Sequence, residues 1–158
     1  MKVFISHYSG EKKLAESLSN WLEDNLKGVE IFCSSRPGEI AAATWREKVI
    51  QEAKENDLEI ALLSPESLGN PWIHFETGLA SAMERHRIVP TVYGGLRIKD
   101  VPSTLSNWEV LDLIDEKQFN ATLSKIFENY YDKDNPPTLN PSWKALPPVL
   151  GVLYAMDH

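Results

Sequence analysis

Segments with the pattern of β-strands alternate with segments of helical periodicity along most of this chain, and that alternation constrains the fold most strongly. The clearest strand is Leu58–Leu63, a nearly continuous apolar run that ends at Ser64-Pro65. Such a run is typical of a central parallel strand covered on both faces. The other predicted strands are apolar runs bounded by turn-forming residues: 3–5, 29–33, 87–93 and 108–113. Pro90 lacks a ladder N–H, which leaves a bulge or a later start of the fourth strand open.

Helical patterns separate these strands. A first helix is predicted from Glu11 to about Asn25, with Ser9 as its N-cap and Glu11 in the first turn, where the helix dipole favours a carboxylate. A capping box at residues 44–47 opens a second helix, and residues 115–118 open the last one.

The alternation predicts an α/β fold: a flavodoxin-like, doubly wound parallel sheet of five strands in the order 2-1-3-4-5, with helices on both faces. Strands one and three are then neighbours, and a ligand crevice is expected at the switch point between them. The crevice would be bounded by the loop 6–8, the loop 34–39 and the segment 64–72.

Composition excludes several classes of protein. With 158 residues, 42% hydrophobic and 25% charged, the chain is expected to form a globular domain. A net charge of -7 disfavours direct nucleic-acid binding. Neither a signal peptide nor an apolar run of the roughly 18 residues that span a membrane is visible, so a cytoplasmic location without membrane attachment is predicted. The single cysteine, Cys33, excludes an intramolecular disulfide.

The predicted domain covers residues 1–131, and a tail follows from residue 132 to residue 158. Five of the ten prolines lie in this tail, which is typical of an extended linker. Its apolar end is too short to cross a bilayer. It is expected to pack back on the domain, to mediate assembly or to lead to another module.

Common catalytic motifs are missing. The first strand is followed by Gly10 alone, without a dinucleotide-binding or phosphate-loop signature, and no nucleophile elbow is present. His7, His74 and His86 lack the spacing of metal ligands, so neither a metal nor a bound cofactor is predicted. His74 is expected to be solvated.

One glutamate departs from the helical pattern. Asn70 is a good N-cap and Pro71 suits a first helical position, so a helix should begin there. Trp72 begins its apolar stripe, and Glu76 falls on that same face four residues later. A carboxylate placed among apolar side chains is partly desolvated, which requires a partner or a function.

A single carboxylate suits a particular reaction. Ordinary glycosidases need two carboxyl groups, one of which protonates the leaving group. Nicotinamide leaves NAD+ as a neutral molecule, so one carboxylate that stabilises the oxocarbenium-like transition state suffices, with Trp72 as a wall of the pocket. The alternative is that Trp72 is a core residue and that Glu76 pairs with Arg36 or Arg46.

Three stretches of the chain together resemble the Toll/interleukin-receptor (TIR) domain, in particular its bacterial NAD-cleaving branch. They are residues 3–7 (VFISH), the second-strand loop 34–38 (SSRPG) and the WxxxE segment 72–76. The resemblance covers residue 1 to about residue 131. It implies that Glu76 is the catalytic residue of NAD+ cleavage, with nicotinamide and ADP-ribose or a cyclic isomer as products.

The resemblance also implies further site residues. Ser6 and His7 would border the nicotinamide side, and Ser34 and Arg36 would bind near the ribose and phosphates. Trp45 would form an aromatic wall, with a core position in the second helix as its alternative. Pro37 stands where receptor-type domains usually have an acidic residue, which disfavours a receptor-adaptor role.

Three functions are therefore considered. The first is an NAD+ glycohydrolase completed by self-assembly, in an immune or defence context. The second is a non-enzymatic module that signals through TIR–TIR contacts of the loop from Ser34 to Glu39. The third is a nucleoside deoxyribosyltransferase, which also uses a glutamate in a doubly wound sheet.

Overall fold

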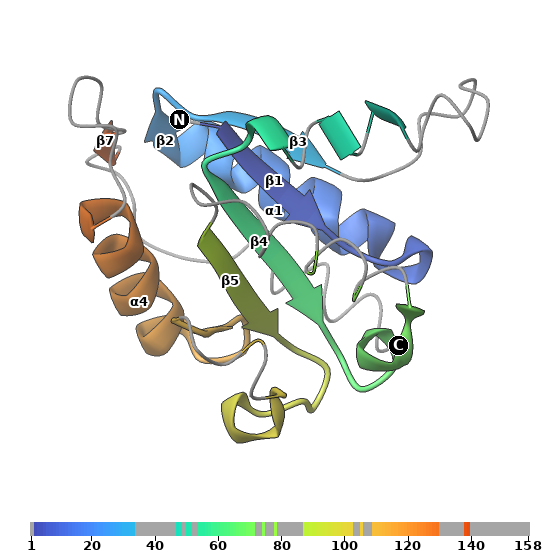
Figure 1. The fold of residues 1–158 in the computed structure, drawn as a ribbon. Coiled ribbons are helices and arrows are strands. Elements are labelled where there is room, and N and C mark those ends of the chain that lie inside the picture. The colour runs from blue at the N-terminus through green and yellow to red at the C-terminus, as the bar shows by residue number, and fades with distance from the viewer. Residues whose placement is uncertain are drawn as a thin grey trace.

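The computed structural model of the chain describes residues 2–33, 47–48, 50–51, 54–71, 74, 78, 87–102, 105, 109–129 and 138–139. One parallel sheet forms the centre of the fold (Figure 1). Its strands are β1 (Lys2–Ser6), β3 (Glu30–Cys33), β4 (Leu58–Leu63), β5 (Arg87–Val92) and β6 (Leu111–Asp112). They lie in the order β3-β1-β4-β5-β6, which confirms the predicted order 2-1-3-4-5.

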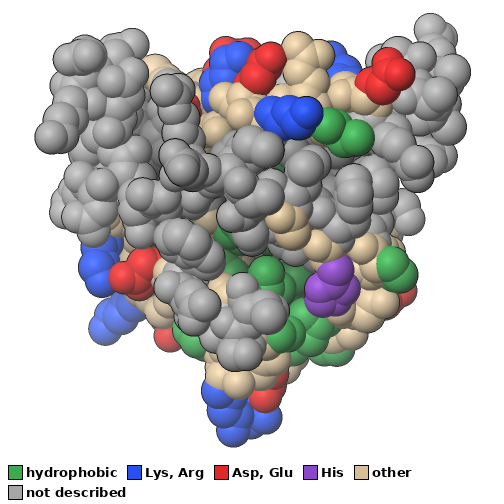
Figure 2. Space-filling view, viewed as in Figure 1, with side chains coloured by type: hydrophobic (Ala, Val, Ile, Leu, Met, Phe, Trp, Pro, Cys, Tyr) green, Lys and Arg blue, Asp and Glu red, His purple; other side chains and the backbone are tan. Residues whose placement is uncertain are grey.

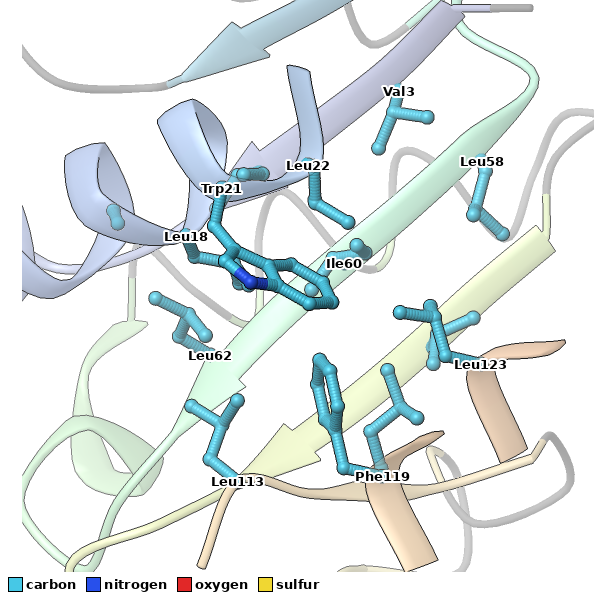
Figure 3. Close-up of a cluster of buried hydrophobic side chains, with 14 of the residues drawn as sticks. Val3, Leu18, Trp21, Leu22, Leu58, Ile60, Leu62, Leu113, Phe119 and Leu123 are labelled. Carbon is cyan, nitrogen blue, oxygen red and sulfur yellow. The ribbon is translucent and has the colours of Figure 1, made fainter. Parts of the chain in front are cut away.

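Two helices, α1 (Lys12–Asn25) and α4 (Glu116–Asn129), pack on one face of the sheet. The alternate β4 residues Leu58, Ile60 and Leu62 point into this core, whereas Glu59 and Ala61 belong to the other face. Between the helices, the rings of Trp21 and Phe119 meet edge to face at 5.8 Å (Figure 3). This apolar layer holds both helices on the sheet.

Aromatic residues mark the opposite face. Phe4 of β1 and Phe32 of β3 are in register, and their rings stack at a centroid distance of 5.7 Å. Lys48, which is helical, places its ammonium group 5.6 Å from the centre of the Phe32 ring. Helical structure therefore lies on both faces, as predicted.

β5 is continuous through Pro90, which pairs with Ala61 of β4. The Tyr93 N–H bonds to Leu63 O of β4, so by alternation the imide nitrogen of Pro90 faces the β6 side. The β6 ladder begins only at Thr91. Proline is therefore tolerated in this strand because no ladder donor is needed at its position.

The last strand is shorter than the predicted 108–113, because only Leu111 and Asp112 pair with β5. The Gln118 side chain of α4 lies along the outer edge of this strand. Its amide donates to Val110 O at 2.7 Å and accepts from Asp112 N at 2.7 Å. A side chain thus takes the backbone bonds that a further strand would otherwise make.

Part of the tail returns to the domain. β2 (Leu26–Lys27) pairs antiparallel with β7 (Thr138–Leu139) in a separate two-stranded sheet. Gly28, at a φ of 78°, then turns the chain towards β3. The three expectations stated for the apolar end of the tail concern residues 149–156, which lie outside the described residues, so they stay predictions.

A short 3₁₀ helix, η3 (Ile98–Asp100), follows β5, and the Arg97 and Asp100 side chains pair around it. Among the described residues, no helix combines the length and the apolar composition that crossing a membrane requires.

Candidate functional site

The carboxyl ends of β1, β4 and β5 form the candidate site. β1 pairs with β3 on one side and with β4 on the other, so the connections from successive strands diverge here, at the predicted switch point. Polar residues follow each of these strands: Ser6 and His7 at β1, Ser64 at β4 and Tyr93 at β5. All four are buried.

His7 is held in one orientation by the backbone. Its Nδ1 atom lies 2.7 Å from Tyr8 O, and because a carbonyl oxygen only accepts, Nδ1 carries the proton. Burial lowers the pKa of the His7 imidazole below its ordinary value of 6.5, against the effect of that hydrogen bond. His7 is therefore neutral near pH 7, with Nε2 as an acceptor. Ser6 ends β1 and is in register with Ala61.

The site also contains the carboxyl group of Glu11, which the sequence pattern predicted only as a residue of the first helical turn. Glu11 is 0% exposed. The Tyr93 hydroxyl donates to its Oε1 atom, and the Tyr8 N–H donates to its Oε2 atom at 3.2 Å. The Ser64 hydroxyl lies 3.4 Å from Oε1. One carboxyl group thus joins the ends of three strands.

The predicted start of the first helix is therefore wrong in detail. A 3₁₀ turn, η1 (Ser9–Glu11), comes first, and α1 begins at Lys12 with Glu11 at the N-cap position. The Glu11 side chain makes no capping bond to α1. Burial against β4 and β5 takes precedence over the dipole interaction, which is typically worth less than 1 kcal/mol at an exposed position.

Burial raises the pKa of the Glu11 carboxyl group to about 7. Hydrogen bonds from Tyr93, Ser67, Tyr8 and Ser64 act in the opposite direction, because they favour the ionised form. Both protonation states of Glu11 are consequently populated near neutral pH.

A compact turn after β4 carries the Ser64 hydroxyl. Ser64 N donates to Ser67 Oγ at 2.7 Å, and Ser67 N donates to Ser64 Oγ at 3.1 Å. Leu68 N donates to Ser64 O at 2.9 Å, at the start of the 3₁₀ helix η2 (Ser67–Gly69). The hydroxyl that faces Glu11 is thus also part of this turn.

Tyr8 connects the loop after β1 to the same turn. Its phenol bonds to the Glu66 carboxylate, and burial together with this bond raises the pKa of Tyr8 to about 12. The ring lies against Gly10, where a Cβ atom would overlap it. Glycine at position 10 is therefore required for this placement of the phenol.

The helix predicted to start at Asn70 is partly described, since Pro71, His74 and Gly78 are helical. His74 is exposed, as predicted, and its Nε2 atom lies 2.7 Å from Leu68 O, to which it donates. Five predicted site residues lie outside the described residues: Ser34, Arg36, Trp45, Trp72 and Glu76. Their roles stay predictions, as do those of Ser6 and His7.

Sequence reasoning missed Glu11, although a usable signal was present. Glu11 and Ser64 follow the predicted strands 3–5 and 58–63 within a few residues, and Tyr93 is the last residue of the predicted strand 87–93. Carboxyl ends of parallel strands meet at one edge of the sheet, so polar residues at these positions come together.

The surface beside these strand ends is apolar. Figure 2 shows hydrophobic side chains gathered in the lower middle of the molecule, where β4 and β5 end in Figure 1, with charged side chains towards the edges. Leu63, Val92, Val101, Leu105 and Val110 form a second buried cluster, which includes residues at the ends of β4 and β5. In the described part of the chain, no group of three His, Cys, Asp or Glu side chains could hold a metal ion.

A family model for the TIR domain matches residues 3–127. The chain belongs to the TIR domain family. The matched region runs from β1 into α4 and so contains all five strands of the parallel sheet. A search among curated proteins found no match for this TIR domain.

Two solved structures of similar fold are a CMP N-glycosidase and a 2-deoxyribosyltransferase. The CMP N-glycosidase BcmB of Clostridium botulinum is 28% identical, with a TM-score of 0.56, and the match covers 79% of this chain and 99% of BcmB. A 2-deoxyribosyltransferase of Bacillus psychrosaccharolyticus is 14% identical, with a TM-score of 0.56, covering 89% of this chain and 99% of its own. The second likeness shows a shared fold alone.

Proposed function

We propose that this TIR domain is an NAD+ glycohydrolase that breaks the bond between nicotinamide and ribose. Glu76 is the catalytic carboxylate in this proposal, and water takes the place of nicotinamide to give ADP-ribose, or an internal nucleophile gives a cyclic isomer. The observation that carries the proposal is the likeness of a TIR family member to an N-glycosidase over 99% of that enzyme. Both reactions break a ribosyl C–N bond.

The state of His7 supports this assignment. The nicotinamide ring of NAD+ is cationic until the bond breaks, so a second positive charge beside it would disfavour binding. Burial keeps His7 neutral, and its Nδ1–H bond to Tyr8 O holds the ring in place. Ser6 and His7 border the nicotinamide in this proposal, while Ser34 and Arg36 bind the ribose and phosphates, and Trp45 and Trp72 wall the pocket.

The test is a product-resolved NAD+ assay at high protein concentration, because assembly through the loop from Ser34 to Glu39 is part of the proposal. Wild type should release nicotinamide, and Glu76→Ala should abolish release. Glu23→Ala, at an exposed position of α1, is the matched control and should keep wild-type turnover. Equal turnover by Glu76→Ala and wild type would refute the role of Glu76.

A nucleoside monophosphate is the second candidate substrate, because the N-glycosidase that resembles this chain acts on CMP. Parallel incubations with CMP and NAD+ separate the two. A third outcome would favour the non-enzymatic TIR–TIR module. In that outcome the protein self-associates, Arg36→Glu weakens the self-association, and neither NAD+ nor CMP is consumed. Transfer between deoxynucleosides would favour the deoxyribosyltransferase.

A further inference from the structure

The Glu11 carboxyl group is the common acceptor of the site. It accepts from the backbone after β1, from the Ser64 hydroxyl after β4 and from the Tyr93 hydroxyl after β5. All three groups donate in this arrangement, and the Tyr8 N–H can only donate, so the arrangement matches a carboxylate better than a neutral acid. The ionised form of Glu11 therefore holds the three strand ends together most completely.

From Glu11, hydrogen bonds continue into the segment that leads towards Glu76. The Ser64 hydroxyl oxygen accepts a hydrogen bond from Ser67 N, and the Ser64 carbonyl oxygen accepts one from Leu68 N. Leu68 O in turn accepts from Nε2 of His74, a helical residue. Glu76 follows His74 by two positions in the sequence. A continuous set of bonds thus runs from Glu11 to the helical residue His74.

We infer that Glu11 is a positioning residue of the active site, which sets the turn from Ser64 to Leu68 and, through it, the helical residue His74, two positions before Glu76 in the sequence. This inference rests on the proposed function for its catalytic readout. Glu11 is fully buried, so its effect on the reaction is assigned to the residues that it holds. Its effect passes through the Ser64–Ser67 turn, and in the described structure no other carboxylate accepts bonds from the ends of all three strands.

Protonation changes what Glu11 can hold. A protonated oxygen becomes a donor. On Oε2 it opposes the Tyr8 N–H, which can only donate, and on Oε1 it requires the Ser64 or Tyr93 hydroxyl to turn and accept. Glutamine has the same shape and carries the same conflict at every pH, because one of its two terminal atoms is a donor. Glu11→Gln therefore mimics the protonated site. The other titratable groups that act on Glu11 are the phenols of Tyr8 and Tyr93, and Tyr8 also bonds Glu66.

The experiment measures NAD+ turnover against pH for wild type, Glu11→Gln and Tyr93→Phe. Wild-type kcat should rise through about pH 7, the pKa of Glu11. In Glu11→Gln, kcat should stay at the low-pH level throughout, about 10- to 100-fold below the wild-type plateau, with KM changed less than about twofold. Tyr93→Phe removes a hydrogen-bond donor to Glu11 and should move the midpoint of the kcat–pH curve to higher pH. Glu23→Gln, at an exposed position of α1, should match wild type.

A second measurement does not depend on the reaction. Amide hydrogen exchange of Ser64, Ser67 and Leu68, whose N–H groups all bond within the turn, should differ between Glu11→Gln and wild type at about pH 8 and should be equal at about pH 5. Unchanged exchange at these amides overturns the inference. So does an unchanged kcat and pH profile in an active Glu11→Gln. Absence of turnover in wild type, with altered exchange in Glu11→Gln, would instead refute the proposed function alone.

Discussion

The Tyr93 hydroxyl donates a hydrogen bond to the Glu11 carboxyl group across a separation of 82 residues in the sequence. Both side chains are buried, and the bond ties the end of β5 to the turn that precedes α1. A buried carboxyl group is stabilised only when such donors surround it. The pair therefore affects both the stability of the domain and the geometry of its site.

Glu11→Gln should change how stability depends on pH. The folded-state pKa of Glu11 is about 7, above its ordinary 4.5. Its stabilising contribution is therefore full below pH 4.5 and is lost as pH rises to about 7, a loss on the order of 3 kcal/mol. The free energy of unfolding of the variant, relative to wild type, should rise across this window and stay constant above it.

Urea unfolding at several pH values from about 5 to about 8 measures this difference. Glu23→Gln provides the matched control, because Glu23 is exposed on the same helix, and its curve should run parallel to that of wild type. If the curve for Glu11→Gln also ran parallel to that of wild type, the raised pKa of Glu11 in the folded state would be contradicted.

Tyr93→Phe should destabilise the domain more at high than at low pH. Above pH 7 the ionised Glu11 loses a buried donor, which costs about 1–3 kcal/mol. Near pH 5 the protonated carboxyl group needs fewer donors, so the cost should be smaller. Chemical unfolding of both single variants and of the double variant with Glu11→Gln measures the coupling. A cost that does not vary with pH would show that Tyr93 acts through packing alone.

His7 should stay neutral at physiological pH, with its proton on Nδ1. Because burial lowers its folded-state pKa below 6.5, its contribution to stability is present above pH 6.5 and is lost as pH falls through the lower value. Nitrogen-15 NMR of labelled histidine reports both the tautomer and the titration midpoint. A midpoint above 6.5, or a proton on Nε2 in the neutral ring, is the contrary result.

Trp21→Ala should destabilise the domain by about 3–5 kcal/mol, because it empties the layer between α1, α4 and the sheet. Trp21 is 4% exposed and meets the Phe119 ring at 5.8 Å. Ile114→Ala is the control, since Ile114 is 55% exposed and should change stability by less than about 0.5 kcal/mol. Thermal and urea unfolding of the two variants compare them. Similar losses for both would mean that the Trp21 contact contributes little.

Strand order and core could be predicted from sequence because they follow from local periodicity and from a few topological rules. Leu58–Leu63 is recognisable as a central strand from its apolar composition alone, and β4 is buried along its whole length. The predicted ends of the helices and strands were less accurate than their order. The Gln118 amide covers the outer edge of β6 from seven residues beyond Leu111, and no rule of strand propensity contains such a contact.

The sequence by itself determined the sheet order, the membership in the TIR family and the place where the strand ends meet, since each depends on the order and spacing of residue types along the chain. Only the tertiary structure decided that Glu11 is a buried acceptor and not a surface residue of a helix N-terminus. The physical reason is distance along the chain: Glu11 meets Ser64 and Tyr93 only after β1, β4 and β5 have paired. The cost of burying its carboxyl group is partly offset by donors that no local pattern could assign to it.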